Sequence, residues 1–128
     1  MKSGDIFLMP APGISSRTPH LWIVVTEPTQ EEHRVIIVSV TTLRKRAEKT
    51  VVLRKGEHPF IRWDSSVCYV DSRLADARDL DGKANCGQIK PHEPCMPHTL
   101  KNIQDGILAS ELTPHKVQDF YLKLTKPK

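Results

Sequence analysis

Apolar residues fall in short runs over the first two thirds of the chain. Residues 20–26 and 35–40 are almost continuous apolar runs rich in β-branched side chains, a pattern typical of strands buried on both faces. Shorter mixed runs at 5–9, 50–54 and 66–71 predict further strands, and 87–90 predicts one short strand more. This part of the chain is therefore expected to form a sheet of short strands, separated by polar turns and by a Pro-rich loop at 10–19.

The spacing of the apolar positions changes near residue 100. Apolar side chains then recur at helical spacing, at Leu100, Ile103, Ile107 and Leu108. A second helix is expected after Thr113 and Pro114, with Thr113 as the N-cap and Pro114 at the first helical position. Its inner face would be formed by Val117, Phe120, Tyr121 and Leu124. Strands followed by two helices predict an α+β fold, a small antiparallel barrel or strongly bent sheet that carries the helices at one end.

Length and composition narrow the class of protein. A chain of 128 residues fits one domain, residues 1–128, and 38% hydrophobic with 27% charged residues is a globular balance. The aliphatic runs are too short to cross a bilayer, and the acidic start is unlike a secretory signal, so we expect a cytoplasmic protein with no membrane partner. The net charge of +4 is compatible with a polyanionic partner.

Side chains that bind zinc gather late in the chain, at Cys86, His92, Cys95 and His98. The spacing lacks a Cys-x-x-Cys pair, and prolines interrupt the segment. We therefore expect these cysteines and Cys68 to be reduced thiols, with no metal and no other cofactor. A structural zinc held by His92-x-x-Cys95-x-x-His98 is the alternative.

A basic run between two expected strands offers contacts for phosphate. It comprises Arg44, Lys45, Arg46 and Lys49, and clustered cations of this kind bind a nucleic-acid backbone. The alternative is an ordinary solvated loop. Aromatic side chains that could stack on bases are Trp22, Phe60, Trp63 and Tyr69. Nucleophile-elbow, P-loop and dinucleotide-binding motifs are missing, which excludes the enzyme classes that those motifs define.

The order of these segments resembles the PemK/MazF/Kid toxin family over about residues 3–110. The resemblance rests on the Gly-Asp-apolar opening at 4–8, the aliphatic strand that ends in Thr41-Thr42, the segment 65–73, and Gly87-Gln88-Ile89-Lys90-Pro91. It implies an SH3-like antiparallel β-barrel with C-terminal helices and a homodimer. It also implies a toxin of a toxin–antitoxin system, a metal-independent endoribonuclease that cleaves single-stranded RNA and is regulated by a cognate antitoxin.

The resemblance carries over to individual residues. Thr41 matches the active-site threonine of the family, and Asp71 matches an acid that serves as general base in part of it. The chain departs from the family where His20-Leu21 replaces Arg-Pro and where Tyr69 replaces a basic residue. The expected catalytic set is His20, Thr41, Asp71 and Arg73. The expected RNA-binding set is Arg17, Thr42, Arg44, Lys45 and Arg46.

A second hypothesis keeps the barrel and drops the catalysis. The loss of arginine at the register of His20 favours a non-catalytic SH3-like barrel that binds a protein or a nucleic acid. The block Gly56–Ile61 has no counterpart in the familiar toxins and marks a divergent branch. A groove that gathers His20, Thr41, Asp71 and an arginine would favour the nuclease, whereas placement of these side chains on separate faces would favour the binding module.

Overall fold

The computed structural model describes residues 1–9, 20–59 and 61–125 of the chain. In chain order, the elements are β1 (Ile6–Met9), β2 (His20–Val24), β3 (Arg34–Thr42), β4 (Val52–Leu53), β5 (Ser65–Asp76), α1 (Ala77–Asn85), β6 (Lys90–His92), α2 (Pro97–Ala109) and α3 (His115–Thr125). The α+β fold class is thereby confirmed. The loop 10–19, which includes Arg17, and the aromatic residue Phe60 lie outside the described residues.

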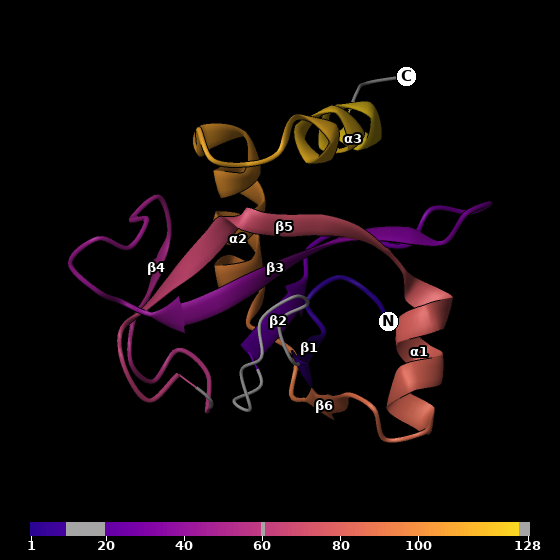
Figure 1. Ribbon diagram of the computed structural model, residues 1–128, viewed down its shortest axis with the longest axis horizontal. Helices are drawn as coiled ribbons and strands as arrows, with labels where there is room; N and C mark the ends of the chain where they lie inside the picture. The colour runs from indigo at the N-terminus through magenta and orange to yellow at the C-terminus, as the bar shows by residue number, and fades with distance from the viewer. Residues whose placement is uncertain (10–19, 60, 126–128) are drawn as a thin grey trace.

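The strands form one curled antiparallel sheet (Figure 1). Their order is β4-β5-β3-β2-β1-β6, so that the short strands β4 and β6 are its two edges. The expected strongly bent antiparallel sheet is therefore present, and the expected runs at 20–26 and 35–40 form its central strands β2 and β3.

Helices pack on both faces of this sheet. The face covered by α2 and α3, called here the α2–α3 face, holds the larger core, to which Ile23, Val38 and Val67 contribute with Ile103 and Val117 of the helices. The opposite face, called the α1 face, holds a smaller core around Phe7, Trp22, Val24, Ile37 and Leu80. Figure 1 shows α2 and α3 on one side of the strands and α1 at the end of β5. In the described part of the chain, no helix combines the length and apolar character that a membrane span requires.

A register shift in β5 separates neighbouring side chains. Ile37 of β3 pairs with Arg73, and Ser39 pairs with Cys68, so residues 69–72 all stand opposite Val38. The loop of extra residues is stabilised by Ser72 Oγ, which donates to the Tyr69 carbonyl at 2.6 Å. A bulge of this kind re-aims side chains and bends the strand. Beyond the bulge, β5 pairs again with β3 and continues to Asp76, past the predicted end at residue 71.

The structure differs from the sequence expectations at three further elements. Helix α1 was not predicted; it begins at Asp76, whose side chain accepts from the Arg78 N–H as an N-cap. Strand β6 lies at Lys90–His92 instead of 87–90. Helix α3 begins one residue late, because its first hydrogen bonds run from Val117 and Gln118 to the Pro114 carbonyl, and the Thr113 hydroxyl has no partner in the described part.

The block 56–61, described except for Phe60, connects the two edges of the sheet. It turns at Gly56, whose φ of 92° suits glycine, and Gly56 N–H donates to the Ile61 carbonyl at 2.9 Å. His58 Nε2 then donates to the Glu93 carbonyl at 2.6 Å. Because the block follows β4 and Glu93 follows β6, this hydrogen bond spans the opening between the two edge strands.

Candidate active site on the α1 face

The α1 face carries polar side chains among its apolar ones, in cross-strand rows on β2, β3 and β5. Alternation along each strand puts three cross-strand rows on this face: His20, Thr41 and Ser66; Trp22, Ser39 and Cys68; and Val24, Ile37 and Arg73. His20 and Thr41 are the next positions on β2 and β3 beyond the Leu21–Val40 pair. Successive rows are about 7 Å apart, so the array spans the width of a dinucleotide backbone rather than a single atom.

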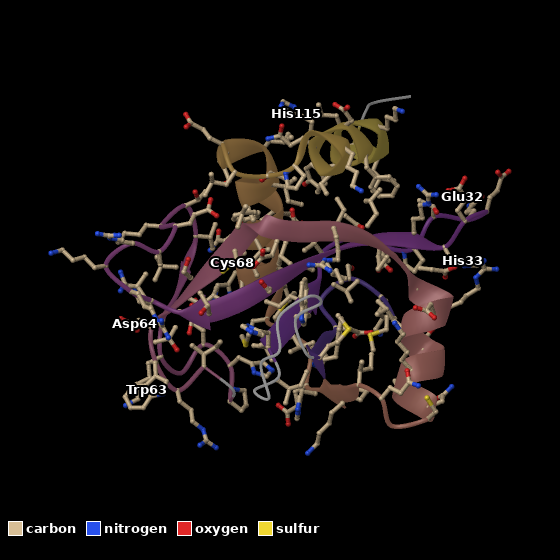
Figure 2. All side chains as sticks on the ribbon, in the orientation of Figure 1. Glu32, His33, Trp63, Asp64, Cys68 and His115 are labelled. Atoms are coloured by element: carbon tan, nitrogen blue, oxygen red, sulfur yellow. The ribbon has the colours of Figure 1, made fainter. Side chains whose placement is uncertain are left out.

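Asp71 reaches back to this array from the bulge. Its Oδ2 accepts from Ser39 Oγ at 3.4 Å, which places the carboxylate beside the middle row. The Cys68 thiol lies in the same row and is half-buried. Burial first and the Asp71 charge second raise the pKa of the Cys68 thiol, which keeps it protonated and a poor nucleophile at neutral pH. The arrangement therefore puts an acidic group, a hydroxyl and an inert thiol side by side (Figure 2 labels Cys68).

Arg73 is held in place by an aromatic ring. Its guanidinium lies over the Trp22 ring, 4.9 Å from the centroid, and its Nε donates to the Asp71 carbonyl at 3.3 Å. Such a cation–π contact orients the guanidinium without neutralising it. The indole is 1% exposed, and its Nε1–H has no acceptor within the described residues. Arg73 and Asp71 thus lie on the α1 face with His20 and Thr41. They do so although the register shift between Cys68 and Arg73 interrupts the regular alternation of β5.

Tyr69 points the other way. It is fully buried in the larger core, and its hydroxyl donates to the Ile103 carbonyl of α2 at 2.7 Å. Side chains two residues apart share a face in a regular strand, but the bulge puts Tyr69 and Asp71 on opposite faces. The position two before the acid, where the resembling family has a basic residue, is therefore a core position here.

The expected RNA-binding residues are not all on the same surface. Thr42 pairs with Ser65 and alternates with Thr41, so it faces away from the α1 face. Arg44, Lys45 and Arg46 are exposed in the loop between β3 and β4, beyond the end of the sheet. Arg17 cannot be placed, because it lies outside the described residues.

Glu48 anchors the basic loop, a role that the sequence analysis missed. Its carboxylate accepts from Tyr69 N–H at 3.1 Å, from Thr50 Oγ1 at 2.8 Å and from Ser110 Oγ at the end of α2. Its backbone carbonyl accepts from Ser66 Oγ. Glu48 therefore ties the loop to the β5 bulge and to α2. Ser39 was missed as well, although a serine inside the apolar run 35–40 is a visible signal of a polar site.

This face has the groups that acid–base chemistry on a phosphate needs. His20 can give or take a proton, Asp71 can act as its counterpart, and Arg73 supplies a fixed positive charge. β2 and β5 are separated by β3 alone, a distance of about 10 Å between strands, and His20 lies one row, about 7 Å along the strands, from the Ser39 that Asp71 contacts, so these groups would have to reach a phosphate from two sides.

The thiols and histidines of the zinc hypothesis are dispersed. Cys86 is exposed after α1, Cys95 is half-buried before α2, and the cysteines are free. Burial raises the pKa of the Cys95 thiol. Over residues 1–9, 20–59 and 61–125, no group of three or more His, Cys, Asp and Glu side chains is arranged to hold a metal ion.

No protein-family model matches this chain, and no curated protein matches it either.

Proposed function

We propose that this protein is a metal-independent endoribonuclease that cleaves single-stranded RNA by attack of the 2′-OH. The observation that carries the proposal is the common face of His20, Thr41, Asp71 and Arg73 on three adjacent strands. The resemblance to the PemK/MazF/Kid family in the order of segments supports the same activity. The curled antiparallel sheet is compatible with the SH3-like barrel of that family, which remains part of the proposal.

The proposed reaction needs no metal and no added water in its first step. A base, His20 or Asp71, takes the proton of the 2′-OH, and the oxygen attacks the adjacent phosphorus. The bond from phosphorus to the 5′-oxygen breaks, and the other group of the pair returns a proton to that oxygen. Arg73 stabilises the extra negative charge of the phosphorane, and the Thr41 hydroxyl donates a hydrogen bond to a phosphate oxygen. The products are a 2′,3′-cyclic phosphate and a free 5′-OH.

The basic loop would bind the RNA outside the cleavage point. Arg44, Lys45 and Arg46 are exposed, so each can contact a phosphate without losing an ion pair to another described residue. In the proposal the protein acts as a homodimer in the cytoplasm and is inhibited by a cognate antitoxin, as the resemblance implies.

A non-catalytic barrel that binds a protein or nucleic acid is the second candidate. The observation that favours it is that Tyr69, at the position where the resembling family has a basic residue, is buried in the larger core and donates to the Ile103 carbonyl.

The test is incubation of purified protein with single-stranded RNA of mixed sequence in the presence of EDTA, with double-stranded RNA as control. We expect cleavage of the single strand and a 2′,3′-cyclic phosphate end. His20→Ala and Asp71→Ala should each lower the rate by at least about 100-fold, because removal of a positioned acid or base costs that much. Arg44→Ala should weaken binding and flatten its dependence on salt, whereas Lys116→Ala on α3 should leave both unchanged.

Two results would count against the proposal in different ways. Intact RNA, together with normal bacterial growth on expression, would leave the non-catalytic barrel as the better account. Cleavage that survives both His20→Ala and Asp71→Ala would keep the activity and reject these residues as its acid and base.

A further inference from the structure

A groove runs between the β2–β3 hairpin and α3, on the side of the molecule away from the α1 face. One hollow of about 530 Å³ lies against hairpin residues 28–32 with Phe120 and Leu124 of α3. A second hollow of about 350 Å³ lies against hairpin residues 26–29 with Gln104, Tyr121, Leu124 and Thr125. Both hollows share Pro28, Thr29 and Leu124, so they form one continuous hairpin–α3 groove.

The floor of the groove is apolar. Phe120 and Tyr121 pack against the larger core and leave part of their rings at the surface, and Leu124 is 41% exposed. An exposed leucine beside two aromatic rings offers a surface on which an apolar side chain of a binding partner would be stabilised by removal from water.

The rim is acidic. Glu27, Glu31 and Glu32 line the groove, and neither hollow is lined by a lysine or arginine among the described residues. Arg34 pairs with Glu32 at 2.7 Å, but both side chains are largely exposed and the pair is screened by solvent. Glu31 has no ion-pair partner in the described part. The groove is therefore negative in a chain whose net charge is +4.

The walls of the groove are fixed by hydrogen bonds. Thr29 ties the hairpin tip together, since its N–H donates to the Arg34 carbonyl at 3.1 Å and its Oγ1 accepts from the Arg34 N–H at 3.0 Å. Gln104 Nε2 donates to the Val25 carbonyl at 2.9 Å and joins the hairpin to α2. A preformed site of this kind loses little freedom when it binds. Figure 2 shows Glu32 and His33 at the hairpin tip, beyond the sheet.

We infer that the hairpin–α3 groove binds a cationic peptide segment of a partner protein, with an apolar side chain against Leu124 and basic side chains against the glutamates. Charge complementarity selects the occupant, because carboxylates attract lysine and arginine and repel the phosphates of a nucleic acid. The groove and the proposed RNA surface lie on opposite faces of the sheet, so partner and RNA can bind together.

The experiment measures the fluorescence anisotropy of a labelled peptide with a central leucine flanked by two lysines on each side, at near-physiological salt. We expect saturable binding to the wild-type protein. Glu31→Lys and Leu124→Ser should each weaken it by at least about tenfold, the first by charge reversal and the second by loss of the apolar contact. The matched controls are Glu111→Lys and Leu122→Ser, exposed residues outside the groove, which should leave binding unchanged.

Peptide variants separate this site from a general attraction of opposite charges. A peptide with serine for leucine should bind at least about tenfold more weakly, and one with glutamate for lysine should not bind. Equal affinity for the leucine and serine peptides, equal affinity of the Glu31→Lys protein, or no saturable binding would each overturn the inference. RNA cleavage in the Glu31→Lys protein should equal that of the wild type, so a failed nuclease test and a failed peptide test are independent results.

Discussion

The bulge of β5 decides, residue by residue, which side chains belong to the candidate site. Tyr69, Asp71 and Arg73 alternate in the sequence as if they shared a face, but the extra residues at 69–72 send Tyr69 into the larger core. The same bulge brings Asp71 to Ser39 and Arg73 to Trp22. A site that needs an acid and a cation on one surface is thus assembled by one irregularity in the strand.

Alkylation of Cys68 reports whether Asp71 faces the site. In a protein with Cys86→Ser and Cys95→Ser, we expect iodoacetamide to label Cys68 slowly, because burial and the Asp71 charge raise the pKa of its thiol. Asp71→Asn removes that charge, lowers the pKa and should speed labelling at pH 8 several-fold, whereas Asp119→Asn on α3 should not. An unchanged rate in Asp71→Asn would show that the carboxylate points elsewhere.

In the core, Gly106 of α2 packs directly against Tyr69 of β5. A Cβ on Gly106 would clash with Tyr69 Oη and lie 2.8 Å from Val51 Cγ2, so Gly106→Ala forces a shift and should cost about 1–3 kcal/mol of unfolding free energy. Tyr69→Phe loses the hydrogen bond to Ile103 and should cost about 1 kcal/mol. Tyr69→Phe removes the nearest obstacle and leaves the ring carbon Cζ, 2.5 Å from the added Cβ, so urea titration of the double variant should show a loss that is smaller than the sum by only part of the Gly106→Ala cost. Strict additivity would contradict this packing.

At the scale of elements, the sequence predicts what is buried and continuous. β2 and β3 are almost wholly buried, so their apolar runs are unambiguous, and α2 follows the spacing of Ile103 and Ile107. Helix α1 has no clear apolar pattern in the sequence, because it buries only Ala77 and Leu80 and contains Gly82. The features that indicate a helix here are the Asp76 N-cap and the Asp79–Lys83 ion pair at 3.2 Å. Strand β6 is the edge segment Lys-Pro-His, which has no apolar residue on a buried face, so a search for apolar runs does not locate it.

For the candidate site, too, local sequence pattern predicts some features and tertiary contacts decide the others. Strand alternation is enough to put Asp71 and Arg73 on one face and Thr41 and Thr42 on opposite faces. It does not give the contact between Asp71 and Ser39, which depends on a register shift between strands distant in sequence. Nor does it give the role of Glu48, whose partners come from β5 and α2.

The loop between β3 and β4 should depend on Glu48 for its order. Glu48→Ala leaves Tyr69 N–H and Ser110 Oγ without their acceptor and should cost about 1–3 kcal/mol of unfolding free energy. Trypsin should then cut after Arg44, Lys45 or Arg46 faster than in the wild type, because the loop opens more often. Glu48→Gln keeps one acceptor oxygen and should be intermediate, and Glu111→Ala should behave as wild type. Equal cleavage rates in Glu48→Ala and wild type would remove the anchor role.

The whole molecule is a sheet whose curl brings its edges toward each other without a shared ladder in the described residues. β4 and β6 pair with β5 and β1 respectively, and the block 56–61 with its His58–Glu93 hydrogen bond spans the gap. Closing edges in this way protects a sheet from pairing with other chains.

Assembly into a homodimer is the first prediction at this scale. It follows from the family resemblance and from the prevalence of symmetric dimers among oligomers. Light scattering at micromolar concentration should return twice the mass of one chain, and dilution should shift the particle toward a single chain. A single-chain mass throughout that range would count against the dimer.

Closure of the sheet should depend on His58. This side chain is only 7% exposed and donates to the Glu93 carbonyl, while Ile61 of the same block, 4% exposed, packs in the larger core. His58→Ala removes this hydrogen bond and should lower the unfolding free energy by about 1 kcal/mol, the usual net contribution of one hydrogen bond. His58→Gln offers an N–H at a similar reach and should recover part of the loss, whereas His115→Ala, exposed on α3, should be neutral. Hydrogen exchange gives the sharper measurement: the amides of β6 and of residues 54–59 and 61 should lose protection together in His58→Ala, because the hydrogen bond from His58 to Glu93 connects the two edges. If β6 keeps its protection while the block alone loosens, then the strand is held by its pairing with β1, and the block covers the edge without closing the sheet.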